Sequence, residues 1–184
     1  MLYDILAMQA IYGVNMNARL GDTVYRFFNK KIGEALPPSD FSTINIGKEE
    51  TFTIWDAGGS FDRIDASDLS TSQVIDLTPG HYSSVDDPSK SLFAIAFNPV
   101  GMENNFIEDA IGGSSDDLLI GNNAGNVLEG RNGADTLVGG AGDDILVGGA
   151  SNDYLYGDAR LADTKHGVTG IGDPNATGID TLYG

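Results

Sequence analysis

Cysteine is absent from this chain, so no disulfide bond can stabilise its fold. A secreted domain of this size without disulfides needs another stabiliser, and a bound metal ion is one. Long apolar runs are also absent, and none reaches membrane-spanning length. The first residues, MLYDILAMQAIYG, lack the basic start and long apolar core of a secretory signal peptide. If the protein is exported, we expect its export signal to lie elsewhere.

Positive charge is scarce. Lys and Arg total 10 against 27 Asp and Glu, which gives a formal net charge of −17. An acidic surface repels nucleic acids and anionic membranes, so neither is expected as a partner. The recurrence of the acids at fixed positions favours cation binding over a general effect on solubility.

Glycine, aspartate and leucine recur every nine residues from Gly112 onward. The first position of the repeat holds Gly112, Gly121, Gly130, Gly139, Gly148 and Gly157. The sixth position holds Asp117, Asn126, Asp135, Asp144 and Asp153. The eighth position holds Leu119, Leu128, Leu137, Leu146 and Leu155. The consensus G-G-x-G-x-D-x-U-x, in which U is apolar, resembles the calcium-binding nonapeptide of RTX proteins.

This period predicts an all-β fold, a parallel β-roll built as a solenoid. The residues around each Leu form a short strand with the Leu facing inward. The preceding six residues turn the chain through half a circuit, which requires the positive φ angles that glycine allows. Two repeats complete one coil, so repeat n stacks on repeat n+2 at about 4.8 Å.

Stacking places the acids of the sixth position in two columns. Neighbouring carboxylates at that spacing repel by roughly 3 kcal/mol at an effective dielectric constant near 20. A cation between coils reverses this sign, and an all-oxygen site that includes turn carbonyls favours Ca²⁺ over Mg²⁺ or Zn²⁺. We expect sites between Asp117 and Asp135, between Asp135 and Asp153, and, weakest, between Asn126 and Asp144. The turn residues expected to contribute are Gly113, Ser115, Gly133, Gly140, Gly142 and Gly149.

The nine-residue frame fails after Gly157 and returns at Gly178, Asp180 and Leu182. The interruption lasts one whole coil. If it is looped out, Asp180 stacks beside Asp144 and completes a calcium site; if it forms a degenerate coil, the two are separated. Pro174 and the polar run favour an irregular loop over 158–175. Because Gly184 opens another repeat, we expect the natural chain to continue.

The first part of the chain predicts a β-rich cap on the roll. Leu2, Ile5 and Leu6 followed by Gly13 predict a short helix over 1–13. Strand-like runs follow within 14–110: DTVYRFF, TFTIWD, QVIDL and SLFAIAF, separated by PPSD, AGGS and TPGH turns. The roll is expected over 111–184, and the cap would cover the end of its apolar core.

Four segments carry a resemblance to a known family. In order they are DILAMQAIYGVNMNARLGDTVYRF, FTIWDAGG, VIDLTPGHYSSV and FIEDAIGGSSDDLLIGN. They resemble the C-terminal region of serralysin-type secreted metallopeptidases. The resemblance implies a secreted, extracellular protein with several bound calcium ions, a catalytic domain N-terminal to this region, and export through a type I secretion apparatus.

The resemblance also implies calcium sites outside the roll. One would use the backbone carbonyls of Arg19, Gly21 and Thr23 with Asp56, Gly58 and Asp62, where an extra residue makes the match at Asp62 less regular. A second would use Gly59, Asp62, the backbone of Phe106 and Glu108. Phe106 stands where the family usually has threonine, so only its carbonyl could serve.

Histidine is almost absent, and this decides the expectation about catalysis. The H-E-x-x-H-x-x-G-x-x-H zinc motif of such peptidases is missing; His81 and His166 are expected to be solvated loop residues, and no Zn²⁺ is expected. No G-x-S-x-G motif is present either. The chain alone is therefore expected to be inactive, as the calcium-binding part of a metalloendopeptidase. The alternative is a standalone calcium-dependent module, such as an adhesin or a polysaccharide-binding roll.

Overall fold

A computed structural model describes residues 22–28, 43–45, 52–55, 61–85, 92–96, 107–158 and 181–184. Every regular element within these ranges is a β-strand, which confirms the predicted all-β class. The predicted helix over 1–13 lies outside the described residues. Among the described residues, no helix is long and apolar enough to span a membrane.

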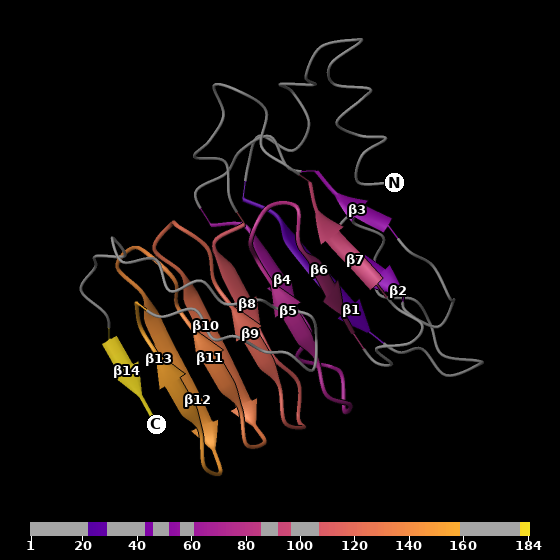
Figure 1. Cartoon of the computed structure of the whole chain (residues 1–184). Coiled ribbons are helices and arrows are strands. Elements are labelled where there is room, and N and C mark those ends of the chain that lie inside the picture. The colour runs from indigo at the N-terminus through magenta and orange to yellow at the C-terminus, as the bar shows by residue number, and fades with distance from the viewer. Residues whose placement is uncertain are drawn as a thin grey trace, which may run out of the picture.

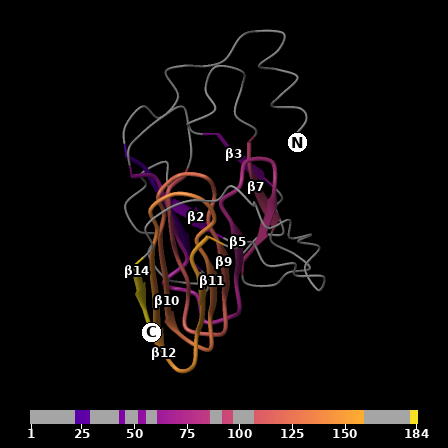
Figure 2. The same ribbon diagram turned by 60° about the vertical axis from the view of Figure 1, so that its left-hand side comes forward.

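The strands form two seven-stranded sheets that face each other (Figures 1 and 2). Sheet A contains, in spatial order, β14 (Thr181–Tyr183), β12 (Ile145–Ala150), β10 (Val127–Asn132), β8 (Asp109–Ile111), β4 (Arg63–Asp65), β1 (Val24–Phe28) and β2 (Thr43–Asn45). Sheet B contains β13 (Tyr154–Tyr156), β11 (Thr136–Val138), β9 (Leu118–Ile120), β5 (Val74–Asp76), β6 (Tyr82–Ser84), β7 (Leu92–Ile95) and β3 (Phe52–Ile54).

Successive repeats of the roll alternate between the two sheets. β9, β11 and β13 pair in parallel in sheet B, and β8, β10 and β12 pair in parallel in sheet A. The register places Leu128 opposite Leu146 and Leu137 opposite Leu155. These partners are 18 residues apart, so two nonapeptides make one coil, as the sequence predicts.

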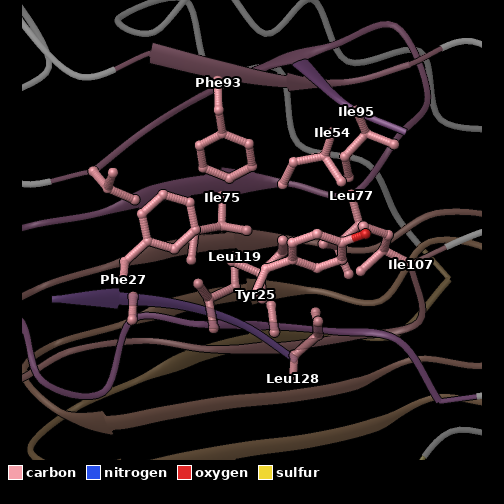
Figure 3. Close-up of a cluster of buried hydrophobic side chains, with 14 of the residues drawn as sticks. Tyr25, Phe27, Ile54, Ile75, Leu77, Phe93, Ile95, Ile107, Leu119 and Leu128 are labelled. Carbon is pink, nitrogen blue, oxygen red and sulfur yellow. The ribbon is translucent and has the colours of Figure 1, made fainter. Parts of the chain in front are cut away.

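The inward leucines form the core of the roll. Leu119, Leu128, Leu137 and Leu146 are fully buried. The same ladder continues into the cap, because Ile75 lies beside Leu119 and Ala110 lies between Leu128 and Ile64. Larger side chains fill the wider part of the core, where the Phe27 and Phe93 rings lie 5.0 Å apart (Figure 3).

The cap continues both sheets of the roll. β4 and β1 extend sheet A in parallel, while β5, β6 and β7 extend sheet B through two antiparallel pairings. The predicted runs in the cap contain β1, β3, β5 and β7. The sequence analysis missed β2, β4, β6 and β8, whose three residues include at most one large apolar side chain, whereas the equally short β3 and β5 have two.

The last strand pairs directly with β12. Ile145 lies opposite Thr181, and the Thr181 N–H donates to the Asp144 carbonyl at 2.8 Å. This is the pairing expected if the interruption of the repeats is looped out, since a degenerate coil would separate the two strands. Asp180 and the interruption from residue 159 lie outside the described residues.

Candidate functional site

Buried acidic side chains lie immediately before three strands of the roll. Asp117, Asp135 and Asp144 are each at most 4% exposed, although carboxylates are costly to remove from water. They precede β9, β11 and β12, and the glycine-rich turns before them bend the chain so that each side chain points back into its own turn. The turns thus concentrate negative charge inside the molecule.

One hydrogen bond repeats from coil to coil and defines the predicted columns. The Asp117 N–H donates to Oδ1 of Asp135 at 2.8 Å, and the Asp135 N–H donates to Oδ1 of Asp153 at 3.0 Å. In the second column the Asn126 N–H donates to Oδ1 of Asp144 at 2.8 Å. The structure therefore brings the sixth-position residues together in the order that the repeat predicts.

The same bond extends both columns into the cap. The Gln73 N–H donates to Asp117 Oδ1 at 2.7 Å, so Gln73 begins the sheet-B column of Gln73, Asp117, Asp135 and Asp153. The Thr23 N–H donates to Asp62 Oδ1 at 2.7 Å, and the Asp62 N–H donates to Glu108 Oε2 at 2.8 Å. The sheet-A column is therefore Thr23, Asp62, Glu108, Asn126 and Asp144.

Sequence reasoning missed Gln73 and treated Thr23, Asp62 and Glu108 as a separate group. A signal was available. Each of these four residues lies two positions before an inward residue of a strand, just as each sixth-position residue lies two positions before its leucine. For Thr23, Asp62, Gln73 and Glu108, the inward residues are Tyr25, Ile64, Ile75 and Ala110 in that order. The spacing of a polar residue and an apolar residue persists in the cap even though the glycines do not.

The second carboxylate oxygens offer a place for a cation. Oδ2 of Asp135 and Oδ2 of Asp153 are buried and have no hydrogen-bond partner. Asp135 Oδ2 and the Gly148 carbonyl oxygen both lie beside Gly130. The carbonyl oxygen is 2.7 Å from the point where a Cβ atom on Gly130 would lie. The Asp135 carboxylate and a carbonyl oxygen of the next coil therefore both pack against Gly130, which has no side chain to keep them apart. Oxygen ligands of this kind suit a hard cation.

Burial, with a smaller contribution from mutual repulsion, raises the pKa values of two carboxyl groups in the sheet-B column. Burial raises the pKa of Asp117 to about 7, with smaller contributions from the charges of Asp135 and Asp116, against hydrogen bonds from Gly113 and Gln73 that lower it. Burial likewise raises the pKa of Asp135 to about 6, with contributions from the charges of Asp153 and Asp116. The fold thus penalises these charges mainly through burial, and to a smaller extent through the repulsion between stacked carboxylates.

The turns have the backbone conformation that the repeat predicts. Gly133, Gly140, Gly142 and Gly149 have φ between 110° and 122°. Of the other predicted turn residues, Gly113 donates its N–H to Asp117 Oδ2 at 2.6 Å, and Ser115 donates its hydroxyl to the Ser70 carbonyl at 2.8 Å. Arg131 and Ser151 adopt the same left-handed conformation without being glycine, which the sequence analysis missed.

Seven of the predicted ligands belong to parts of the chain that the structure does not describe. Arg19, Gly21, Asp56, Gly58, Gly59, Phe106 and Asp180 lie outside the described residues. Within the ranges that are described, no group of three or more His, Cys, Asp or Glu side chains is arranged to hold a metal ion. The candidate sites of the roll would instead combine a few carboxylates with backbone carbonyl oxygens.

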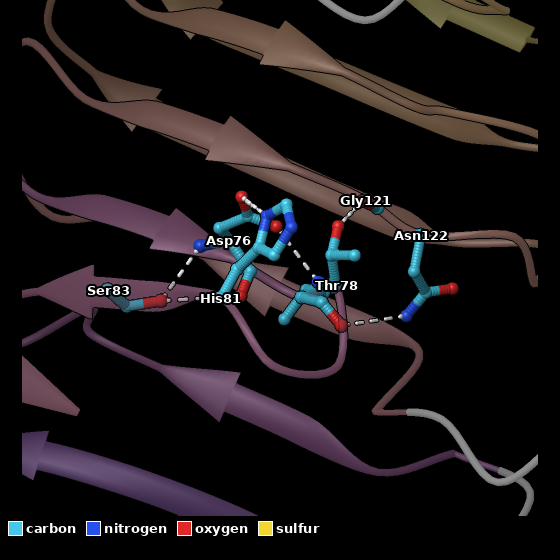
Figure 4. A network of polar contacts seen from close by, with 7 residues as sticks. Asp76, Thr78, His81, Ser83, Gly121 and Asn122 are labelled. Carbon is cyan, nitrogen blue, oxygen red and sulfur yellow. Dashed lines mark hydrogen bonds and ion pairs between the residues drawn. The ribbon is translucent and has the colours of Figure 1, made fainter. Parts of the chain in front are cut away.

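His81 is an exposed loop residue, as the sequence predicts, and its ring also has a partner. Its Nδ1 lies 2.8 Å from Oδ2 of the buried Asp76, while its side chain is 46% exposed (Figure 4). The Ser83 hydroxyl is directed to the backbone of Asp76, accepting from its N–H at 2.9 Å and donating to its carbonyl. This arrangement fixes the β5–β6 turn rather than pairing a nucleophile with a base. His166 lies outside the described residues.

Known proteins with similar sequences share this region. The family model described as Peptidase M10 serralysin C terminal matches residues 14–180. Serralysin G of Dickeya chrysanthemi is 41% identical over 118 residues, which is 64% of this chain and 22% of that protein. Serralysin of Proteus mirabilis is 40% identical over 120 residues, 65% of this chain and 22% of that protein.

A third relative, Metallopeptidase AprA of Pseudomonas marginalis, is 37% identical over 118 residues, with 64% of this chain and 22% of that protein covered. The chain thus spans about a fifth of the length of these relatives. Because the family model covers most of the chain, from the cap through the repeats, the protein belongs to the family of serralysin C-terminal regions.

Proposed function

We propose that this chain is the calcium-binding C-terminal module of a serralysin-like secreted zinc metalloprotease. One observation carries the proposal: Oδ2 of Asp135 and Oδ2 of Asp153 are buried without a hydrogen-bond partner in a column of stacked carboxylates. An unpaired buried carboxylate oxygen is unfavourable unless a cation or a proton accompanies it.

The residues present fit calcium. Asp135 and Asp153 would supply carboxylate oxygens from successive coils, and the turns would supply carbonyl oxygens such as that of Gly148. Ca²⁺ tolerates irregular all-oxygen coordination, whereas Zn²⁺ prefers nitrogen and sulfur ligands that these turns lack. When bound, the ion supplies the positive charge that offsets the repulsion within a column.

Folding then depends on the calcium concentration. A ligand that binds only the folded state stabilises that state by mass action. Extracellular calcium modules bind at about 0.1 to 1 mM, close to external supply and far above cytosolic levels. The roll therefore stays unfolded during export through a type I apparatus, folds outside the cell, and supports folding of the catalytic domain that precedes it.

The similarity to much longer relatives supports a missing catalytic domain. Those relatives are named as serralysins and a metallopeptidase, and the match with this chain covers only 22% of the length of each. Since the zinc-binding H-E-x-x-H-x-x-G-x-x-H motif is absent here, we expect no degradation of casein by this chain. Zinc-dependent activity of the chain alone would contradict the assignment.

Calorimetry and far-UV circular dichroism test calcium binding directly. The wild-type chain should gain β-structure between excess chelator and millimolar Ca²⁺, and Asp135→Asn together with Asp153→Asn should reduce the number of bound ions. The matched control is Asp158→Asn, which removes one exposed carboxylate after β13. Identical spectra in chelator and calcium would refute the proposal.

Measuring secretion tests whether calcium-dependent folding of the roll affects export. Secretion of the parent protein should fall when calcium inside the producing cell is raised, because the roll would fold before export. Unchanged export under those conditions would count against this part of the proposal while leaving calcium binding intact.

A further inference from the structure

The hydrogen-bond pattern of the sheet-A column reverses at one step, between Glu108 and Asn126. At the other steps of both columns, a backbone N–H donates to a carboxylate of the next coil. Here the side-chain amide of Asn126 donates through Nδ2 to the Glu108 carbonyl at 2.7 Å. At this step a side-chain N–H group therefore takes the place that a carboxylate oxygen has at the other steps of the two columns.

Asn122 strengthens this step from the same turn. Its Nδ2 donates to the Ile107 carbonyl at 2.8 Å and to the Leu77 carbonyl at 3.3 Å. Figure 4 shows Asn122 reaching from the turn after β9 toward the loop around Thr78, whose hydroxyl donates to the Gly121 carbonyl at 3.4 Å. Asn122 thereby ties the first coil of the roll to β5 and to the segment before β8.

The two amides also satisfy each other. Asn126 Nδ2 lies 3.2 Å from Asn122 Oδ1, which also accepts the Ala124 N–H at 2.8 Å. Asn126 Oδ1 accepts the Asn122 N–H at 2.8 Å. Both side chains are 1% exposed, and all of their polar atoms have partners within the protein. No charge is buried by this pair, so nothing here requires a cation.

We propose that Asn122 and Asn126, with the carbonyls of Leu77, Ile107 and Glu108, form a calcium-independent amide junction. The amide junction holds the first coil of the roll on the cap when the ion is absent. The calcium-dependent coils beyond it then add to a folded end instead of having to nucleate alone. This inference rests on the proposed calcium binding by the Asp117, Asp135 and Asp153 column.

Hydrogen–deuterium exchange of the full chain, in chelator and in millimolar Ca²⁺, tests the amide junction. In chelator, amides in 107–128 should exchange at least about tenfold more slowly than those in 136–156. Calcium should protect 136–156 strongly and 107–128 much less, because Asp117 alone in the second segment belongs to the sheet-B column. Equally fast exchange of both segments in chelator would overturn the inference.

Two substitutions sharpen the test. Asn126→Asp places a carboxylate against the Glu108 carbonyl, so protection of 107–128 in chelator should fall by about tenfold and return with calcium. Asn122→Ala should cause a similar loss that calcium does not restore, because a methyl group offers no ligand. If both variants keep wild-type protection in chelator, the amide junction does not hold the coil.

Asp144→Asn is the matched control, because it makes the opposite exchange of amide and carboxylate one coil further along the same column. It should leave protection of 107–128 in chelator unchanged and weaken the response of 136–156 to calcium. The proposed function and the amide junction fail in different ways. Without calcium binding, no segment responds to the ion; without the junction, 136–156 still responds but 107–128 is unprotected in chelator.

Discussion

Individual carboxylates in the sheet-B column are held in an environment that disfavours their charge. Asp117 and Asp135 accept backbone hydrogen bonds that favour ionisation, yet burial outweighs those bonds and raises both pKa values. Two agents can relieve this cost: a proton, or a cation placed between the coils. We therefore expect protons and calcium to compete for the same oxygen atoms, and the stability of the fold to depend on pH in opposite directions with and without the ion.

In chelator, the chain should be more stable at pH 5 than at pH 7.5. The folded-state pKa values of about 7 and about 6 lie above the ordinary 3.8, so the folded state binds more protons than the unfolded state between these values. This stabilisation is complete below the unfolded pKa and is lost as pH rises through 6 to 7. Thermal melts in chelator check the direction, and Asp117→Asn with Asp135→Asn should flatten the dependence.

In calcium the trend should reverse, because protonated carboxylates bind the ion poorly. Apparent calcium affinity, measured by calorimetry, should fall as pH drops from 7.5 toward 5.5. An affinity that does not change over this range would show that Asp117 and Asp135 do not hold the ion.

Gly133, at the fourth position of its repeat, allows close approach of successive coils. At Gly133, φ is 122° and an added Cβ would lie 2.5 Å from the Ser115 carbonyl. Gly133→Ala should lower the free energy of unfolding by more than about 1 kcal/mol in calcium, measured by denaturant titration. Ser151→Ala is the control one coil away, since Ser151 already carries a Cβ at φ 96°, and it should have little effect.

At the scale of the strands, inward leucines and β-sheet pairing determine how much each coil contributes. Each strand of the roll presents few inward residues, so the leucine of each repeat, with Ile120 and Val138 in sheet B, provides most of the apolar burial. The contribution falls toward the C-terminal end of the ladder, where Leu155 is partly buried and Leu182 is 49% exposed. The last strands are therefore expected to open before the inner ones.

Leu137→Ala, in the fully buried part of the ladder, should lower the free energy of unfolding by about 2 to 5 kcal/mol. Leu182→Ala removes the same atoms from a half-exposed position in β14 and should cost less than about 1 kcal/mol. Equilibrium denaturation of the two variants in calcium measures the difference. Equal losses would contradict the graded ladder.

For the whole molecule, charge opposes compaction. The net charge of −17 creates repulsion that bound calcium would partly neutralise and that dissolved salt would screen. In chelator, raising sodium chloride from about 0.05 to 0.5 M should therefore raise the melting temperature. The increase should be smaller in calcium, because buried ions are screened less by salt. A larger increase in calcium than in chelator would contradict this reasoning.

The sequence by itself determined the roll. Because the nine-residue spacing of glycine, aspartate and leucine allows one stacking, it predicted the alternation between sheets, the inward ladder from Leu119 to Leu155 and the columns of Asp135 and Asp144. The cap strands β2, β4, β6 and β8 escaped prediction, since three residues with at most one large apolar side chain carry almost no periodicity. Their pairing is set by long-range contacts, such as Ile64 with Ala110.

Only the tertiary structure decided how cap and roll join. Thr23, Asp62 and Gln73 are far from the repeats in sequence, and only the folded chain shows that they continue the two columns. The repeat also treats Asn126 as a weaker aspartate, whereas the contacts of its Nδ2 with Glu108 and Asn122 reverse the direction of the hydrogen bond. A sequence repeat specifies contacts between equivalent positions of successive coils. Where the repeats meet the cap, the neighbouring residues are not part of the repeat, so only the folded chain shows which atoms are in contact.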